Sequence, residues 1–192
     1  MLADLSCLGG VRSLSFLTAV VKESLRLSSP VPFLGRNVDK PMRIGKHYIP
    51  PGAQVLVCPV ILHHHEDTWA DSWEFKPERF MEGFGFDAKP IASTSSKGAG
   101  VTNRRGRTSS SDGAPRQEPF AFLPFSAGSR GCIGRQFALL EEKVVLMTLL
   151  RRFKWTTVRD QDIYIETGII MRPAGGKLRI HFEPRQPVSP RA

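Results

Sequence analysis

A glycine-rich run with a single cysteine reads Pro124-Phe125-Ser126-Ala127-Gly128-Ser129-Arg130-Gly131-Cys132-Ile133-Gly134. Residues 133–153 follow with the apolar spacing and the composition of a long helix, so Cys132 is expected just before a helix. Glycines allow positive φ angles and let the backbone come close to a flat ligand. The start of a helix adds unpaired N–H groups and the positive end of a dipole. Together these features favour a thiolate at Cys132 over a thiol.

A thiolate held in this way suits a particular kind of metal site. As an axial ligand, a thiolate pushes electron density onto haem iron, and hydrogen bonds to its sulfur tune the potential. Arg130, two residues before the cysteine, is placed to pair with a carboxylate at the edge of such a cofactor. An isolated cysteine is more often a buried structural residue, so the interpretation of Cys132 depends on its neighbours.

Those neighbours stand at fixed spacing. Phe125, Gly128, Arg130, Cys132 and Gly134 fit the pattern Phe-x-x-Gly-x-Arg-x-Cys-x-Gly. The run therefore resembles the haem-binding signature of the cytochrome P450 family. The resemblance implies that Cys132 is the axial ligand of the iron in haem b, and that the other four residues help to bind the cofactor.

Two further segments resemble the same family and stand in the family's order. Residues 22–27 carry Glu23 and Arg26 three positions apart, as in the family's Glu-x-x-Arg helix. Residues 77–80 read Pro-Glu-Arg-Phe, the element whose arginine, here Arg79, completes that pair. The resemblance implies a buried structural network of these three charged residues. On spacing alone, a weak pair on a solvated helix face is the more common interpretation.

The resemblance extends to two more stretches. Arg36, in the run at residues 33–36, falls where many family members place a second arginine that contacts a haem propionate. Residues 62–65 read Leu-His-His-His and are similar to the family's Leu-His-His stretch. Adjacent histidines can also suggest zinc, but consecutive residues rarely converge on one ion, and no spaced set of further ligands accompanies them.

The chain is expected to be mainly α with small β-sheets, an α+β fold that forms the C-terminal portion of the cytochrome P450 fold. Apolar spacing predicts helices over residues 14–27 and 133–153, and residues 63–80 predict a packed irregular loop. Short apolar runs between turn residues predict strands at 33–38, 42–49, 54–59, 163–165, 168–172 and 178–182. Residues 173–176 predict a hairpin that joins the last two strands.

The domain organisation predicted from composition is a partial cytochrome P450 domain over residues 1–192. Residues 86–118 are rich in Ser, Gly, Thr and Arg and predict a disordered insertion. The odd, irregularly spaced set of Cys7, Cys58 and Cys132 argues against a disulfide framework. No stretch fits a bilayer span or a signal peptide well, and the net charge of +9 suits an acidic protein, an anionic membrane or nucleic acid.

The resemblance implies a haem-dependent monooxygenase that inserts one oxygen atom of O2 into a small lipophilic substrate. Details of the motifs lean toward the fatty-acid hydroxylase-like branch. Electrons are expected from NAD(P)H through a reductase or a ferredoxin-type donor, and a basic surface near Arg135 and Lys143 would suit an acidic reductase. An endoplasmic reticulum location is expected if a full-length anchored form exists.

Two alternatives stay open. The portion that precedes the Glu-x-x-Arg helix in the family, which builds the distal side of the haem pocket, has no counterpart in the sequence. The polypeptide alone is therefore expected to be inactive, and it could be a non-catalytic truncated remnant or an incomplete gene model that at most binds haem. Residues 104–107, Arg-Arg-Gly-Arg, suggest nucleic-acid binding, but a solvated linker is the favoured interpretation and no nucleic-acid partner is expected.

Overall fold

The computed structural model describes residues 14–81 and 120–185. Cys7 and the insertion predicted at residues 86–118 lie outside the described residues. Helices and small two-stranded sheets make up the described part of the chain, so the predicted α+β class is confirmed.

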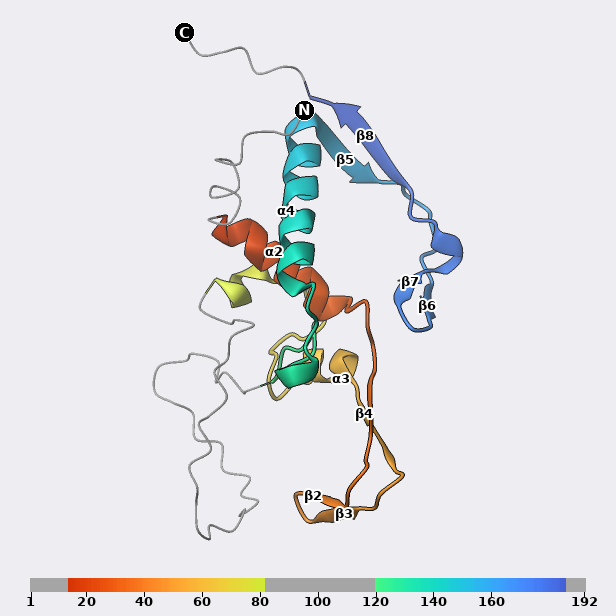
Figure 1. Ribbon diagram of the computed structural model, residues 1–192. Coiled ribbons are helices and arrows are strands. Elements are labelled where there is room, and N and C mark those ends of the chain that lie inside the picture. Colours follow the sequence, from red (N-terminus) through yellow and green to blue (C-terminus); the bar gives the residue numbers. More distant parts are fainter. Residues whose placement is uncertain (1–13, 82–119, 186–192) are drawn as a thin grey trace.

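Helices α2 (Ser15–Leu27) and α4 (Arg135–Arg152) contact each other at the centre of the structure (Figure 1). Their ends agree within two residues with the helices that the apolar spacing predicts. Helix α2 ends where the Ser28 N–H donates to the Ser24 carbonyl at 2.8 Å, shortly before Pro30, which cannot continue a helix. Apolar spacing located both helices because it reflects the face that each one buries.

The hydrophobic core joins α2 and α4 to two irregular segments. Three aromatic rings lie at its centre: Trp69 and Phe80 have centroids 5.8 Å apart, and Phe80 and Phe122 have centroids 4.9 Å apart. Burial of one such ring contributes about 1.5–3 kcal/mol to the free energy of unfolding. In the described part of the chain, the core comprises Ala19, Val21, Leu25, Trp69, Phe80, Ala121, Phe122 and Leu139. Because residues 121 and 122 belong to it, the core fixes the chain just before the cysteine run.

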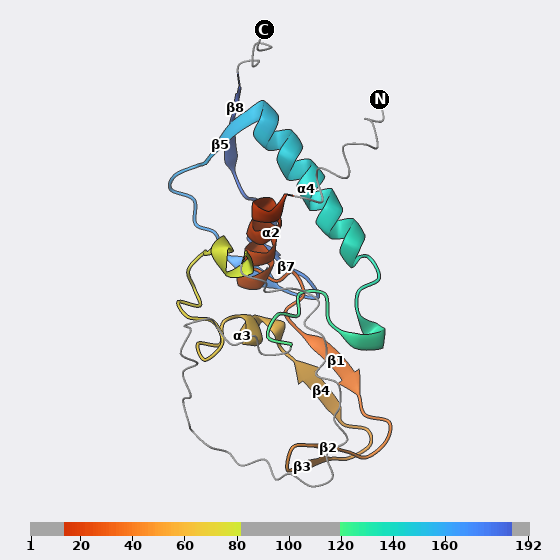
Figure 2. The same ribbon diagram turned by 90° about the vertical axis from the view of Figure 1, so that its left-hand side faces the viewer.

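All the strands within residues 14–81 and 120–185 pair as antiparallel two-stranded sheets. The pairs are β1 (Leu34–Asn37) with β4 (Gln54–Val57), β2 (Met42–Ile44) with β3 (His47–Ile49), β5 (Phe153–Thr157) with β8 (Ile180–Pro184), and β6 (Ile165–Thr167) with β7 (Met171–Pro173). The β2–β3 hairpin and the β5–β8 ribbon lie at opposite ends of the structure (Figures 1 and 2). The β1–β4 sheet lies between that hairpin and the helices.

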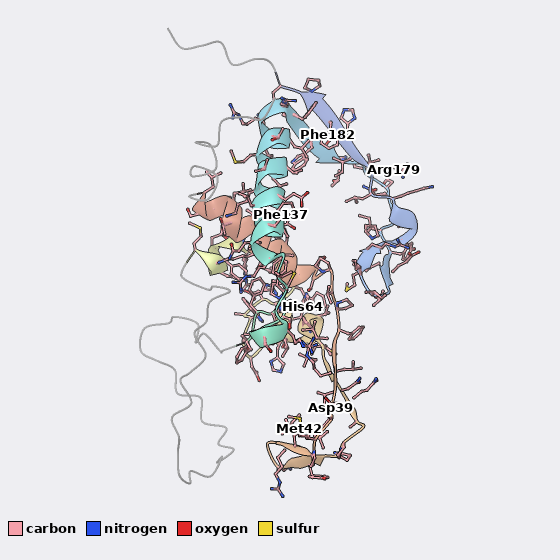
Figure 3. All side chains as sticks on the ribbon, in the orientation of Figure 1. Asp39, Met42, His64, Phe137, Arg179 and Phe182 are labelled. Atoms are coloured by element: carbon pink, nitrogen blue, oxygen red, sulfur yellow. The ribbon has the colours of Figure 1, made fainter. Side chains whose placement is uncertain are left out.

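The prediction that residues 168–172 and 178–182 pair as a hairpin is wrong. Strand β7 pairs with β6, and β8 pairs with β5, which begins at Phe153 where the sequence predicts the end of a helix. Phe182 of β8, labelled in Figure 3, packs against Phe153 and Trp155 at centroid distances of 5.8 and 5.9 Å. Residues 174–176 form a 3₁₀ turn instead of a hairpin turn. Turn residues mark a change of direction but do not select a distant strand as partner.

The segment between α3 (Pro59–His63) and the 3₁₀ turn η1 (Pro77–Phe80) is the expected packed irregular loop. Trp69 anchors it with only 1% of its surface exposed. Trp73 is 75% exposed and does not belong to the core; its ring centroid lies 4.1 Å from that of His64. One buried tryptophan thus fixes the loop against α2.

Candidate functional site

Cys132 lies in an exposed loop between the 3₁₀ turn η2 (Gly128–Arg130) and α4, and its thiol is not in a disulfide. Its backbone N–H donates to the Phe125 carbonyl at 2.9 Å, which closes the loop. Gly128 has a φ of +71°, a conformation that residues with a Cβ rarely adopt. The loop therefore holds the thiol at the surface by backbone hydrogen bonding and by one left-handed glycine.

The signature residues have different surroundings. Phe125 is half-buried and packs against the core cluster, whereas Arg130 and Cys132 are exposed. Gly134 caps α4, and a Cβ added there would lie 3.8 Å from the Cys132 sulfur. An inward phenylalanine thus anchors a loop whose thiol and arginine face outward, with a residue lacking a side chain beside the sulfur.

Arg36 lies beside this loop although 90 positions separate it from Ser126. Strand β1 carries it, and its Nη2 lies 3.5 Å from the Ser126 Oγ, while Nη1 donates to the Gly35 carbonyl at 2.7 Å. The guanidinium is otherwise exposed. The structure therefore brings Arg36 to the cysteine loop. Figure 2 shows β1 beside the green turn that precedes α4.

Glu23 and Arg26 form a bidentate pair on α2. Two nitrogens of Arg26 each lie 2.8 Å from a carboxylate oxygen of Glu23, and both side chains have 0% exposure. Arg26 also donates to the carbonyls of His63, Ser72 and Glu74 at 2.8, 2.6 and 3.1 Å. A buried pair is tolerated only when its remaining hydrogen-bonding groups are satisfied. Arg26 meets that condition by donating to the last residue of α3 and to two residues of the irregular loop.

Arg79 completes this cluster. Its Nε lies 3.4 Å from the Glu23 Oε1, and its Nη2 donates to the Asp71 carbonyl at 2.9 Å. The same Glu23 oxygen accepts the backbone N–H of Lys76 at 2.9 Å. We call Glu23, Arg26 and Arg79 the brace; it ties α2 to the loop at residues 64–76.

His63 also belongs to the site, although its motif alone does not assign it a role. Its ring is fully buried and lies 5.3 Å from that of Phe122. The ring Nε2 accepts the Leu123 N–H at 2.9 Å, and the His63 carbonyl accepts Arg26. The Leu-His-His-His run drew attention to this position, but only the fold shows where each ring points.

Burial of His63 predicts pH-dependent stability. The pKa of His63 is lowered from 6.5 to about 4. The main cause is desolvation by burial, and the charges of His64 and Arg26 lower it further. Between these pH values the unfolded chain binds more protons, so this stabilisation is complete above 6.5 and is lost as the pH falls toward 4. At 1.36 kcal/mol per pKa unit the loss is about 3 kcal/mol.

Urea unfolding at about pH 7 and about pH 4.5 measures this loss. The matched control is His63→Gln, whose side chain does not titrate and which is expected to lose much less stability over the same range. A pH dependence as steep in His63→Gln as in the wild type would contradict the assignment.

The basic surface predicted near Arg135 and Lys143 is wrong for Lys143. The Lys143 side chain is buried, and desolvation lowers its pKa. Lys143 follows the buried Leu139 by four positions, so the two share one face of α4. Of the predicted pair, Arg135 is half-buried and keeps part of its surface exposed, whereas Lys143 does not.

Within residues 14–81 and 120–185, no helix has both the length and the apolar composition needed to cross a bilayer. The same residues contain no cluster of three or more His, Cys, Asp or Glu side chains that could hold a metal ion. In particular, the adjacent histidines diverge, since the His63 ring reaches Leu123 and the His64 ring stacks on Trp73.

Comparison with known proteins identifies the family. The cytochrome P450 family model matches residues 7–180. Cytochrome P450 4c3 of Drosophila melanogaster is 33% identical over 88% of this chain and 26% of its own length. The 7-deoxyloganic acid hydroxylase of Catharanthus roseus is 35% identical over 90% of this chain and 28% of its own. Cytochrome P450 4V2 of Homo sapiens is 30% identical over 86% of this chain and 26% of its own length.

Solved structures give the same answer for the fold. The retinoic acid-bound cyanobacterial CYP120A1 superimposes with a TM-score of 0.70 and 25% identity, over 92% of this chain and 34% of that one. CYP102L1, at 23% identity, shares the fold with a TM-score of 0.68. The chain spans just over a quarter of the length of the curated relatives it matches. Because the family model covers most of the chain, this protein belongs to the cytochrome P450 family.

Proposed function

We propose that this chain is the haem-thiolate part of a monooxygenase, with Cys132 as the axial ligand of the iron in haem b. The observation that carries the proposal is the cysteine loop. It presents an exposed thiol outside any disulfide, and it contains all five fixed residues of the family signature. A thiolate-ligated haem supplies the activation of dioxygen, because the sulfur favours O–O cleavage.

The donor set around the thiol fits haem. Two exposed guanidinium groups, those of Arg36 and Arg130, flank the loop and are available for the two propionates. Gly134 lacks a side chain beside the sulfur, which leaves room for a flat ligand. These residues bind and orient the cofactor, while Phe125 anchors the loop in the hydrophobic core.

The overall reaction inserts one oxygen atom of dioxygen into an organic substrate, and the other atom leaves as water with electrons from NAD(P)H. A reductase or a ferredoxin-type protein delivers those electrons. The substrate is a fatty acid or another lipophilic compound. Support comes from a related fold with retinoic acid bound, and one relative is named for hydroxylation of an organic acid, 7-deoxyloganic acid. An anchored full-length form would lie in the endoplasmic reticulum membrane.

The function is tested with the full-length protein, a reductase, NADPH and isotopically labelled dioxygen, using a panel of fatty acids. One labelled oxygen atom in a hydroxylated product is the expected result. A haem-loaded protein that consumes no NADPH and forms no product with any panel member would favour the alternative, a non-catalytic remnant that only binds haem.

Replacement of Arg36 by alanine is expected to speed the loss of haem. Hydrogen bonds to charged groups contribute about 1.5–3 kcal/mol, so the rate should rise roughly tenfold to a hundredfold. Transfer of haem to excess apomyoglobin measures the rate of haem loss. The control is Arg43→Ala, an exposed arginine on β2, which should leave the rate unchanged. Equal rates of haem loss in the two variants would contradict the role of Arg36 in binding the cofactor.

A further inference from the structure

His63 makes contacts on two sides, through its backbone and through its ring. At the C-terminal end of α3, its carbonyl accepts a hydrogen bond from Arg26 Nη1 at 2.8 Å. Its ring Nε2 accepts one from the Leu123 N–H at 2.9 Å. A single residue therefore connects the brace to the segment that leads into the cysteine loop.

The ring contact defines the role of each nitrogen. Because a backbone N–H can only donate, Nε2 must be the acceptor, and the neutral ring carries its proton on Nδ1. In the part of the chain that the structure describes, Nδ1 is buried without a hydrogen-bond partner. The hydrogen bond from Leu123 thus gives the buried ring its polar contact.

Leu123 is the first fixed point of the cysteine loop. Its N–H is held by His63, and its carbonyl lies 3.3 Å from the Ser126 N that donates to it. Two residues later the Phe125 carbonyl accepts the Cys132 N–H. Leu123 is thus bonded on one side to His63 and on the other, through Ser126, to the loop that carries the thiol.

We propose that His63 is a positioning residue for Cys132: it transmits the placement of Arg26 to the cysteine loop by accepting the Leu123 N–H. The inference rests on the proposed function for its consequence at the haem, but the contact itself can be measured without the cofactor. The low pKa of His63 supports the assignment, because a ring that stays neutral near pH 7 keeps Nε2 as an acceptor.

Two substitutions separate hydrogen bonding from packing. His63→Gln keeps an acceptor near the position of Nε2, whereas His63→Leu fills the space without one. Hydrogen exchange of the Leu123 amide in the haem-free full-length protein should be at least about tenfold faster in His63→Leu, and close to the wild-type rate in His63→Gln. In the haem-loaded protein, His63→Leu should lose thiolate-type ferrous–carbonyl absorption and His63→Gln should retain it.

Equal exchange rates in His63→Leu and the wild type would overturn the proposal. So would equal damage in both variants, including failure of both to fold, because packing alone would then explain the residue. Folding of His63→Gln but not of His63→Leu supports it. Failure of the proposed function is separate: the wild type would lack the thiolate band, while the exchange of Leu123 would still report on His63.

Discussion

Arg26→Ala is expected to lower the free energy of unfolding by about 3–5 kcal/mol, the range for breaking a buried ion pair. The substitution leaves the Glu23 carboxylate buried opposite a cavity, and it removes the donor to the carbonyls of His63, Ser72 and Glu74. Since a domain is stable by only about 5–15 kcal/mol, the variant should fold poorly or not at all.

Urea unfolding followed by tryptophan fluorescence measures this change, because the buried Trp69 becomes exposed to water on unfolding. Arg26→Lys keeps the charge but not the planar fork, and it should fall between alanine and the wild type. The control is Arg151→Ala, on the exposed surface of α4, with an expected change within about 0.5 kcal/mol. A loss in Arg26→Ala no larger than this control would show that the brace does not stabilise the fold.

Much of the fold was accessible from local sequence signals. The helices α2 and α4 follow from apolar spacing, and β1 and β4 follow from apolar runs divided by proline and glycine. The single strand predicted over residues 42–49 is wrong, because the chain turns at Gly45 and the two halves pair as β2 and β3. The pairing of β5 with β8 was missed because the partners are far apart in the sequence. That pairing depends on contacts such as Phe153 with Phe182, which no local pattern specifies.

The candidate site divides in the same way. The loop at Cys132 and the members of the brace could be located because fixed spacing identifies them one residue at a time. Two features were not predicted: the direction of the His63 ring, and the burial of Lys143. Both depend on which neighbour covers a given face, although the spacing of Lys143 from Leu139 gave a usable signal.

Cys132→Ala is expected to abolish thiolate ligation of haem completely, because alanine offers the iron no donor atom. The fold should survive, since Cys132 is exposed and surface substitutions usually change stability by less than about 0.5 kcal/mol. Cys58→Ala is the matched control. Cys58 is half-buried at the start of α3 and carries no signature residue near it, so its removal should leave ligation intact.

The ferrous–carbonyl difference spectrum of the full-length, haem-loaded protein tests the role of Cys132 most directly. The wild type and Cys58→Ala should show the red-shifted Soret band of a thiolate-ligated haem, and Cys132→Ala should lack it. A band of undiminished intensity in Cys132→Ala would contradict the assignment of this cysteine as the iron ligand.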